Sequence, residues 1–311
     1  MPSSSRTLLA RLFDQPYLLL ILTMIFWAGN AIVGRYVAGD IPPVTLAFIR
    51  WTGATMLIMP FAWRYLKRDW PVIRKNLGVL LMISIAGVGA FNTLQYTALE
   101  YTQAINVVLL LAAGPLFIAM WSLILLGVRL TWMQAAGIAL SMLGVLVILL
   151  RGDLGELAHI RFNTGDLLII VALAIFGYYS VMVLKRPEIH GLSFLAFTFC
   201  CGALSLVPLL MLELWLRPVM AVTLPNLLAL AYVVVFPSTL AYPCYNRAVE
   251  LIGANRSAPF GHLVPLFGTV LAIVLLGERM HLFHVIGFVL VLSGIYIAAR
   301  KPRNASVSDS K

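Results

Sequence analysis

One segment of the sequence occurs twice: GPLFIAMWSLILLG at residues 114–127 returns as VPLFGTVLAIVLLG at residues 264–277. The match extends without a gap from residues 98–151 to residues 248–301, at a constant offset of 150. Matches of proline, glycine and arginine carry most of the weight, because leucine and alanine coincide often in an apolar chain. The offset is far longer than the roughly 20–50 residues of solenoid repeats. We therefore expect one half of the protein to be a duplicate of the other.

Composition indicates that the surrounding solvent is lipid. Of the 311 residues, 61% are hydrophobic and 11% are charged, against about 45–50% and about 25% in soluble domains. A bilayer core needs uncharged runs of about 20 residues, and helices satisfy every backbone group within one segment. Ten such runs are predicted as transmembrane helices: Pro16–Val37, Val44–Trp63, Leu77–Tyr96, Ala104–Leu126, Trp132–Leu150, Leu167–Leu184, Leu192–Leu212, Leu227–Tyr245, Ser257–Leu276 and Leu282–Ala299. The expected fold is an all-α polytopic membrane protein.

Charge distribution predicts the orientation of these helices. Of the 22 lysines and arginines, sixteen fall on the side of the amino terminus and five on the other side, with Arg50 inside a helix. Positive residues collect on the cytoplasmic side, so both terminal tails, 1–15 and 301–311, are expected in the cytoplasm of a cell with the protein in its inner (plasma) membrane. The basic clusters predict contact with anionic membrane lipid and not with nucleic acid.

The two halves are expected to be inverted relative to each other. Five helices in each half is an odd number, so the second half must enter the membrane from the opposite side. The predicted repeats are residues 16–151 and 164–300. In a chain of this composition, inverted repeats are typical of secondary transporters, whose site lies between the halves.

Several short motifs resemble the EamA family of the drug/metabolite transporter superfamily. They are Phe26-Trp27-Ala28-Gly29-Asn30, Arg50, Ala98–Ala104, the Pro115 and Pro265 positions, and the Leu126-Gly127 and Leu276–Arg279 turns. The resemblance covers roughly residues 17–300 and is closest to bacterial aromatic amino-acid exporters of YddG type. It implies export of aromatic and other neutral amino acids. Val128 stands where the family often has glutamate, matching Glu278, so a symmetric pair of glutamates is not expected.

Polar and aromatic side chains inside the helices are the candidates for a substrate-binding cavity, because such groups usually face a cavity or a partner. The predicted cavity-lining residues are Trp27, Asn30, Asn92, Gln95, Tyr96, Tyr178, Tyr179, Tyr242, Tyr245, Asn246 and His262. For Tyr96 and Tyr178 the alternative is a place in the interfacial aromatic belt. For His262 the alternative to a proton relay is a histidine satisfied by its neighbours. Together these groups suit an amphipathic zwitterion.

Arg50 is the only basic residue deep inside a predicted helix. It either binds a substrate carboxylate through two hydrogen bonds, or it has a structural role, pairing with Glu100 or Glu278 or holding helix-end carbonyls. Because an arginine here is common in the family across unlike substrates, the structural role is favoured.

Pro115 and Pro265 occupy matching positions in the fourth and ninth runs, where each removes a helix hydrogen bond. They are predicted either as paired hinges or as static kinks. Pro237 and Pro243 predict an irregularity in the eighth run that the third run lacks. The small residues of the fifth and tenth runs, among them Gly137 and Gly287, predict close packing or a homo-oligomer surface.

Motifs of the common enzyme and nucleotide-binding classes are not found in the sequence. The sequence holds no HExxH, GxSxG or phosphate-loop pattern, so we expect no enzyme, no cofactor and no metal. Cys200, Cys201 and Cys244 lie inside predicted helices and form no CxxC pair. The expected function is export of neutral amino acids or similar small metabolites by alternating access, and the alternative is a multidrug or lipid-type exporter.

Overall fold

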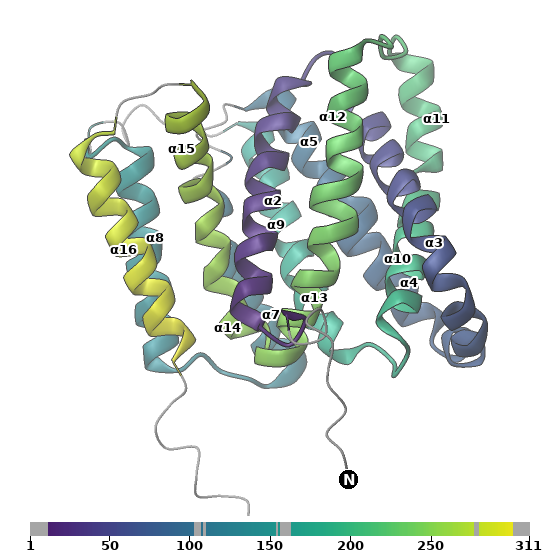
Figure 1. Ribbon diagram of the computed structural model, residues 1–311, viewed down its shortest axis with the longest axis horizontal. Helices are drawn as coiled ribbons and strands as arrows, with labels where there is room; N and C mark the ends of the chain where they lie inside the picture. Colours follow the sequence, from purple (N-terminus) through teal and green to yellow (C-terminus); the bar gives the residue numbers. More distant parts are fainter. Residues whose placement is uncertain are drawn as a thin grey trace, which may run out of the picture.

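The computed structural model describes residues 12–102, 107, 110–153, 155, 163–276 and 280–300, and every regular element in this part is a helix (Figure 1). In chain order the elements are α2 (Pro16–Tyr36), α3 (Pro43–Lys75), α4 (Leu77–Ser84), η1 (Ile85–Ala90), α5 (Phe91–Tyr101), α7 (Gly114–Leu126), α8 (Trp132–Leu149), α9 (Thr164–Met182), η3 (Val183–Lys185), α10 (Gly191–Ser205), α11 (Val207–Leu216), α12 (Leu224–Val234), η4 (Val235–Leu240), α13 (Ala241–Ile252), α14 (Ala254–Ser257), η5 (Ala258–His262), α15 (Leu263–Leu276) and α16 (Leu282–Ala299). Residues 1–11 of the predicted amino-terminal tail, the whole carboxy-terminal tail and the Gly277–Arg279 turn lie outside the described residues.

Eight helical segments of the described chain are long and apolar enough to cross a membrane. They are Pro16–Tyr36, Pro43–Lys75, Leu77–Tyr101, Trp132–Leu149, Thr164–Lys185, Gly191–Leu216, Leu224–Ile252 and Leu282–Ala299. The fourth and ninth predicted runs correspond to shorter helices, α7 with 13 residues and α15 with 14 residues. The protein is thus an all-helical, multi-pass membrane protein in its described part, and the number ten stays a prediction.

Local sequence signals explain where several helices begin and end. Thr131 and Gln134 form a reciprocal capping box at the start of α8, and Asn163 and Asp166 form another at the start of α9, which satisfies backbone N–H groups that a helix start leaves unpaired. Gly127 ends α7 in a left-handed conformation, with φ 67°, which a residue without a Cβ adopts at no steric cost.

The helix pair α8–α16 packs closely along one side of the bundle, where Figure 1 shows the two side by side. Gly137 lies against the backbone of Gly294, and Gly144 lies against that of Gly287; a Cβ added at any of these positions would collide with the partner helix. Small residues allow this approach. The small residues of α8 and α16 therefore allow these two helices to pack against each other within the chain. A homo-oligomer formed through these helices stays a prediction, and its interface would have to use their outer apolar faces.

Two buried carboxylates hold α3 against the α10–α11 segment, one at each end of α3. Glu213 of α11 accepts hydrogen bonds from the backbone N–H groups of Val44 and Thr45, at 3.0 and 2.7 Å, and from the Thr45 hydroxyl at 2.8 Å. Asp69 of α3 accepts from the backbone N–H of His190 at 2.8 Å and from the Ser193 hydroxyl at 2.7 Å, at the start of α10. Each carboxylate faces a helix amino terminus, where negative charge is stabilised.

The third and eighth helical segments carry the same irregularity. Both contain a six-residue π-helical turn, η1 at Ile85–Ala90 and η4 at Val235–Leu240, and the two turns lie 150 residues apart. The prediction that only the eighth run is irregular, at Pro237 and Pro243, is therefore wrong. The third segment has no proline, and its Gly87 and Gly89 weaken the α-helix at the same place.

The beginning of α2 and the end of α16 lie at the same end of the bundle (Figure 1). The Tyr17 hydroxyl donates to the Ala299 carbonyl at 3.4 Å, and Arg256 donates to the same carbonyl. We refer to this end as the N-terminal end and to the other as the opposite end. Arg217 and Glu100 form a two-bond ion pair at the opposite end, with 2.5 and 3.0 Å between nitrogen and oxygen.

Candidate functional site: a central cavity

A cavity of about 90 Å³ lies in the centre of the bundle. Its walls come from α2, α5, α7, α9, α13, α14, η5 and α15 and from Leu111, so segments far apart in the sequence meet here. The lining residues are Met24, Trp27, Asn30, Ala31, Phe91, Asn92, Gln95, Leu111, Gly114, Pro115, Ile118, Leu173, Phe176, Tyr242, Tyr245, Ser257, Ala258, Gly261 and Val264. None of them carries a charge. The volume is below the roughly 300–1,000 Å³ of pockets for drug-sized ligands, so the occupant is small or the cavity widens to admit it.

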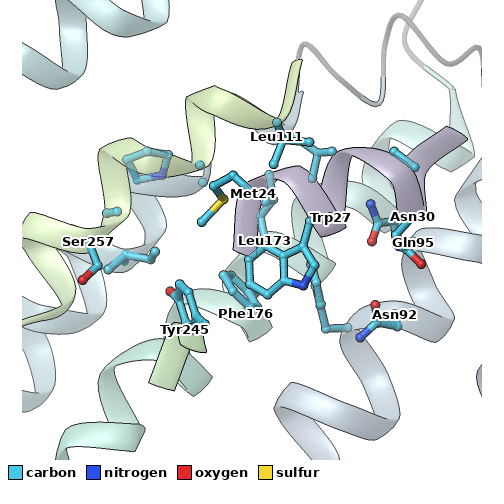
Figure 2. A pocket seen from close by; sticks show the side chains of 18 of the residues that line it. Met24, Trp27, Asn30, Asn92, Gln95, Leu111, Leu173, Phe176, Tyr245 and Ser257 are labelled. Carbon is cyan, nitrogen blue, oxygen red and sulfur yellow. The ribbon is translucent and has the colours of Figure 1, made fainter. Parts of the chain in front are cut away.

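Six of the predicted cavity residues and one predicted hinge do line this cavity: Trp27, Asn30, Asn92, Gln95, Tyr242, Tyr245 and Pro115. Figure 2 shows Asn30 and Gln95 at one end, Ser257 at the other, and the rings of Trp27, Phe176 and Tyr245 between them. The cavity therefore has an amide-rich end and an aromatic middle.

The aromatic middle is a contiguous cluster. Trp27 lies 5.1 Å from Tyr245 and 5.5 Å from Phe176 between ring centroids, and Phe91 lies 4.6 Å from Phe176. Offset and edge-on pairs at such distances attract each other beyond the burial of their area. Sequence reasoning missed Phe91, Phe176 and Met24. Each of them lies three or four residues before a predicted site residue and so on the same helix face. Phe91 precedes Gln95, Phe176 precedes Tyr179, and Met24 precedes Trp27, and this spacing could have identified them.

Arg50 lies behind the amide-rich end and is only 1% exposed. Its Nη1 donates to Asn30 Oδ1 at 3.1 Å, to Asn92 Oδ1 at 2.9 Å and to the Tyr96 hydroxyl at 2.7 Å. Its Nε donates to the Ser238 hydroxyl at 2.6 Å and its Nη2 to the Pro237 carbonyl at 3.2 Å. Within the described residues no carboxylate pairs with Arg50, and Glu100, one predicted partner, pairs with Arg217 instead.

Both π-helical turns supply carbonyl groups to side chains of the site. In η4 the Pro237 carbonyl accepts from Arg50 and also from Trp27 Nε1, at 3.2 Å each. In η1 the Gly87 carbonyl accepts from the Tyr242 hydroxyl at 2.8 Å, and that hydroxyl accepts from Asn92 Nδ2 at 3.2 Å. A π turn interrupts the i→i−4 ladder, and such turns are frequent at functional sites.

Tyr96, Tyr179 and Asn246 lie in buried hydrogen bonds away from the central cavity. The Tyr96 hydroxyl donates to Asn30 Oδ1 at 2.7 Å, and the Tyr179 hydroxyl donates to Asn246 Oδ1 at 2.8 Å. Tyr179 also packs on Gly87, where a Cβ would collide with its ring. These three residues are not in the lining of the central cavity; their polar groups hold neighbouring helices together, and their role as substrate-binding residues stays a prediction.

Tyr178 and His262 also lie outside the central cavity. Tyr178 packs edge-on against Trp121, with 5.3 Å between centroids. His262 is fully buried; its Nε2 lies 2.8 Å from the Ala112 carbonyl, and its Nδ1 lies 2.6 Å from the Ser141 hydroxyl. A carbonyl only accepts, so Nε2 carries a proton and both ring nitrogens have partners. His262 is thus a satisfied core histidine in this structure.

Two wider cavities lie toward the two ends of the bundle. One of about 530 Å³ shares Asn30, Ala31, Gln95, Leu111 and Val264 with the central cavity and extends to Arg35, Arg151 and His284. Tyr96 and Pro265 belong to its lining. The shared residues place this wide cavity directly next to the central cavity, toward the opposite end of the bundle.

The second wide cavity, of about 650 Å³, lies at the N-terminal end and shares no lining residue with the central cavity. Asn246 lies in its wall, with ion pairs around it. Arg247 pairs with Asp14 at 2.6 Å, and Arg186 pairs with Glu250 at 2.7 Å. The central cavity therefore shares walls with the wide cavity toward the opposite end and shares none with the wide cavity at the N-terminal end.

Pro115 lies in the first turn of α7 and Pro265 in the first turn of α15. The N–H groups of a first turn have no partner within the helix, so a proline is tolerated there and removes no helix hydrogen bond. The structure thus places both prolines just after a break in the chain of helices, and Pro115 also lines the central cavity.

The described residues contain no group of three metal-ligating side chains. Their buried carboxylates act as structural acceptors: Asp69 and Glu213 cap helices, and Asp166 accepts from the Thr102 hydroxyl at 2.6 Å. The cavity thus offers neutral hydrogen-bonding groups, aromatic rings and a nearby buried cation.

Comparison with known proteins gives consistent matches along the chain. The model of the EamA-like transporter family matches twice, at residues 15–150 and 163–300. A protein of Archaeoglobus fulgidus, described as an uncharacterized transporter, is 30% identical over 295 residues, which cover 93% of this chain and 98% of that protein. A protein of Salmonella typhimurium, named a probable amino-acid metabolite efflux pump, is 26% identical over 306 residues, covering 93% and 97%. A crystal structure that is 19% identical superposes with a TM-score of 0.71 over 91% of this chain and 96% of that one, which shows a shared fold.

Proposed function

Because this chain belongs to the EamA-like transporter family, we propose that it exports neutral, preferentially aromatic, amino acids or similar small metabolites across the bacterial inner membrane by alternating access. The observation that carries the proposal is the uncharged central cavity, with amides at one end and aromatic rings in the middle. Relatives named as amino-acid efflux pumps support the same substrate class.

The cavity has complementary groups for each part of such a substrate. The Asn30 and Gln95 amides offer N–H groups to a carboxylate, and the Gln95 amide oxygen offers an acceptor to an ammonium group. The rings of Trp27 and its neighbours suit an aromatic side chain, at about 0.5–1.5 kcal/mol for each ring pair beyond area burial. Neutral partners bind a zwitterion without fixing a full ion pair, which allows release.

The two halves, residues 16–151 and 164–300, act in this proposal as inverted five-helix repeats around the central cavity, with ten transmembrane helices and both termini in the cytoplasm. The π turns 150 residues apart support the repeat. Packing of α2 against α13 and of α5 against α9 supports a site built by both halves. In this proposal the structure represents an outward-connected state, since the central cavity shares walls with the wide cavity toward the opposite end and none with the one at the N-terminal end.

Movement of substrate is proposed to be passive, because no carboxylate of the described residues lines the central cavity. The test is flux of labelled amino acids in liposomes that contain the purified protein, with and without a proton ionophore. We expect phenylalanine and tryptophan to move down their gradients at rates that the ionophore leaves nearly unchanged.

Accumulation against a gradient that the ionophore collapses would contradict passive movement and indicate proton coupling. Indifference to every amino acid, with flux of amphipathic drugs or lipids instead, would replace the proposed function by the multidrug or lipid-type alternative. Empty liposomes and liposomes with a Trp27→Ala variant serve as controls.

A further inference from the structure

The orientation of two amides in the site follows from the chemistry of Arg50. A guanidinium group only donates hydrogen bonds. The atoms of Asn30 and Asn92 that lie 3.1 and 2.9 Å from Arg50 Nη1 must therefore be their oxygens. Each amide nitrogen then points away from Arg50.

The two amide nitrogens have different partners. Asn92 Nδ2 donates to the Tyr242 hydroxyl at 3.2 Å. No hydrogen bond of Asn30 Nδ2 is found among the described residues, although its oxygen is held by both Arg50 and Tyr96. Asn30 lines both the central cavity and the wider cavity next to it. Its N–H groups are thus fixed in a position where a ligand can receive them, beside the amide of Gln95 (Figure 2).

Arg50 also places a positive charge behind this end of the cavity. It is buried, and no described carboxylate pairs with it. Inside a protein of low dielectric constant, an unpaired charge acts over several ångströms and polarises the amides that it contacts. An anionic group at the Asn30 end is favoured by this charge, and a cationic group there is repelled.

We propose that Arg50 is a positioning residue that makes the Asn30–Gln95 end of the central cavity a binding subsite for the carboxylate of an apolar substrate. Arg50 acts through Asn30 and does not touch the substrate, because Arg50 is buried and lines none of the three cavities, and its Nη1 and Nε donors are used by Asn30, Asn92, Tyr96 and Ser238. The inference rests on the proposed function and names the group that the site recognises: a carboxylate is required, and an ammonium group alone is not sufficient.

The first test needs no variant. Exchange of labelled phenylalanine is measured in liposomes with two competitors, 3-phenylpropanoate, which has the carboxylate alone, and phenethylamine, which has the ammonium group alone. We expect 3-phenylpropanoate to compete at least tenfold better than phenethylamine. Equal competition, or better competition by phenethylamine, overturns the inference and leaves the proposed function intact.

Variants then separate positioning from support of the fold. Asn30→Asp keeps the oxygen that Arg50 and Tyr96 hold but replaces the free N–H groups by a second oxygen. It should weaken competition by 3-phenylpropanoate at least tenfold and strengthen competition by phenethylamine. Arg50→Gln should weaken 3-phenylpropanoate more than phenethylamine, and Arg50→Lys, which retains the charge, should restore part of the difference.

Asn226→Asp is the matched control, because it makes the same change at a buried amide of α12 that lines none of the three cavities. It should leave the ratio of the two competitors unchanged. An equal loss for both competitors in Arg50→Gln reduces Arg50 to a structural residue and overturns the inference. If labelled phenylalanine is not exchanged at all, the proposed function fails; a thermal shift of the purified protein with 3-phenylpropanoate but not with phenethylamine would then still support the carboxylate subsite, and its absence would overturn it.

Discussion

Trp27 connects the aromatic middle of the cavity to the backbone of η4. Its ring contacts Phe176, Tyr242 and Tyr245, and its Nε1 donates to the Pro237 carbonyl. The same side chain therefore forms a wall for the substrate and holds a π turn, and two different substitutions separate these roles.

Trp27→Ala is expected to reduce the transport efficiency of phenylalanine and tryptophan about tenfold, the effect of a lost contact of about 1.4 kcal/mol. Threonine should be affected less, because a small side chain does not reach the lost ring. Trp27→Phe keeps an aromatic wall and loses the hydrogen bond, so it should retain most of the preference for aromatic substrates. Initial rates of exchange in liposomes measure this, and equal losses for large and small substrates would assign Trp27 to the fold.

His262 of η5 contacts two other segments through its two ring nitrogens. Its Nε2 binds the Ala112 carbonyl, and its Nδ1 binds the Ser141 hydroxyl of α8. His262→Phe leaves the Ser141 hydroxyl and the Ala112 carbonyl without this partner, which costs about 1–3 kcal/mol for a buried polar group. We expect lower thermal stability in detergent and an unchanged shape of the pH profile of exchange. A pH profile that becomes flat in this variant would show instead that His262 carries protons.

At the scale of elements, the two prolines of the fourth and ninth runs have the clearest consequences for movement. Each lies in the first turn of a short helix, just after the break that separates this helix from the preceding segment, and alanine in its place would allow the helix to continue across the break. If these breaks are hinges, straightening them changes the equilibrium between conformations more than it changes the contacts with substrate.

Pro115→Ala and Pro265→Ala are therefore expected to lower the maximal exchange rate several-fold, with little change in the substrate concentration at half-maximal rate, since conformational steps often limit turnover. Pro60→Ala is the control, because Pro60 lies inside α3 and lines none of the three cavities. Unchanged rates in both variants, at normal expression, would make these prolines static kinks.

The start of α10 provides a pH-dependent contribution to stability. His190 Nδ1 accepts from the Leu192 N–H at 3.2 Å, which requires an unprotonated Nδ1. Burial lowers the pKa of His190 from its ordinary 6.5, nearby Arg68 and Arg186 lower it further, and Asp69 opposes the shift. Because the unfolded chain takes up the proton first, this contribution is complete above pH 6.5 and is lost as the pH falls through the lowered pKa of the folded state.

Lowering the pH from 7.5 to 5 should therefore reduce the thermal stability of the wild type more than that of His190→Asn, in which asparagine keeps the capping acceptor and does not titrate. The difference between the two melting temperatures as a function of pH is the measurement. Parallel curves would exclude His190 as a source of the pH dependence.

For the whole molecule, orientation is the feature that the charge distribution predicts most directly. Single cysteines are introduced at Asn76 and at Asn163 after replacement of Cys200, Cys201 and Cys244. An impermeant thiol reagent added to intact cells should label position 163 and leave position 76 unlabelled, because the segment with Arg64–Lys75 is expected in the cytoplasm. The reverse pattern would contradict the predicted topology and the outward-connected reading of the cavities.

Much of the fold could be predicted from the sequence, because lipid imposes helices and their length. The bounds of α2, α8 and α16 agree with the predicted runs to within one residue. The extension of α3 to Lys75 could not be predicted from hydropathy, since its last turns are charged and project beyond the apolar segment.

The site was predicted in part for a related reason. A polar side chain in a membrane helix is expected to face away from lipid. The sequence does not show whether it then lines a cavity or forms a buried hydrogen bond with a neighbouring helix. Asn30 and Asn246 are both buried amides that accept from a tyrosine hydroxyl, yet only Asn30 lines the central cavity. Apolar residues such as Phe176 escaped the prediction because nothing in their type separates cavity walls from core.

The paired π turns show that one backbone irregularity can be kept by unlike side chains. Turns at Ile85–Ala90 and Val235–Leu240 stand at the same place in each copy of the family unit, whereas the side chains within them are Gly-Val-Gly and Pro-Ser-Thr. The bend therefore belongs to the repeated unit and not to one particular set of side chains, and the carbonyls that each turn presents are available to the opposite half of the molecule.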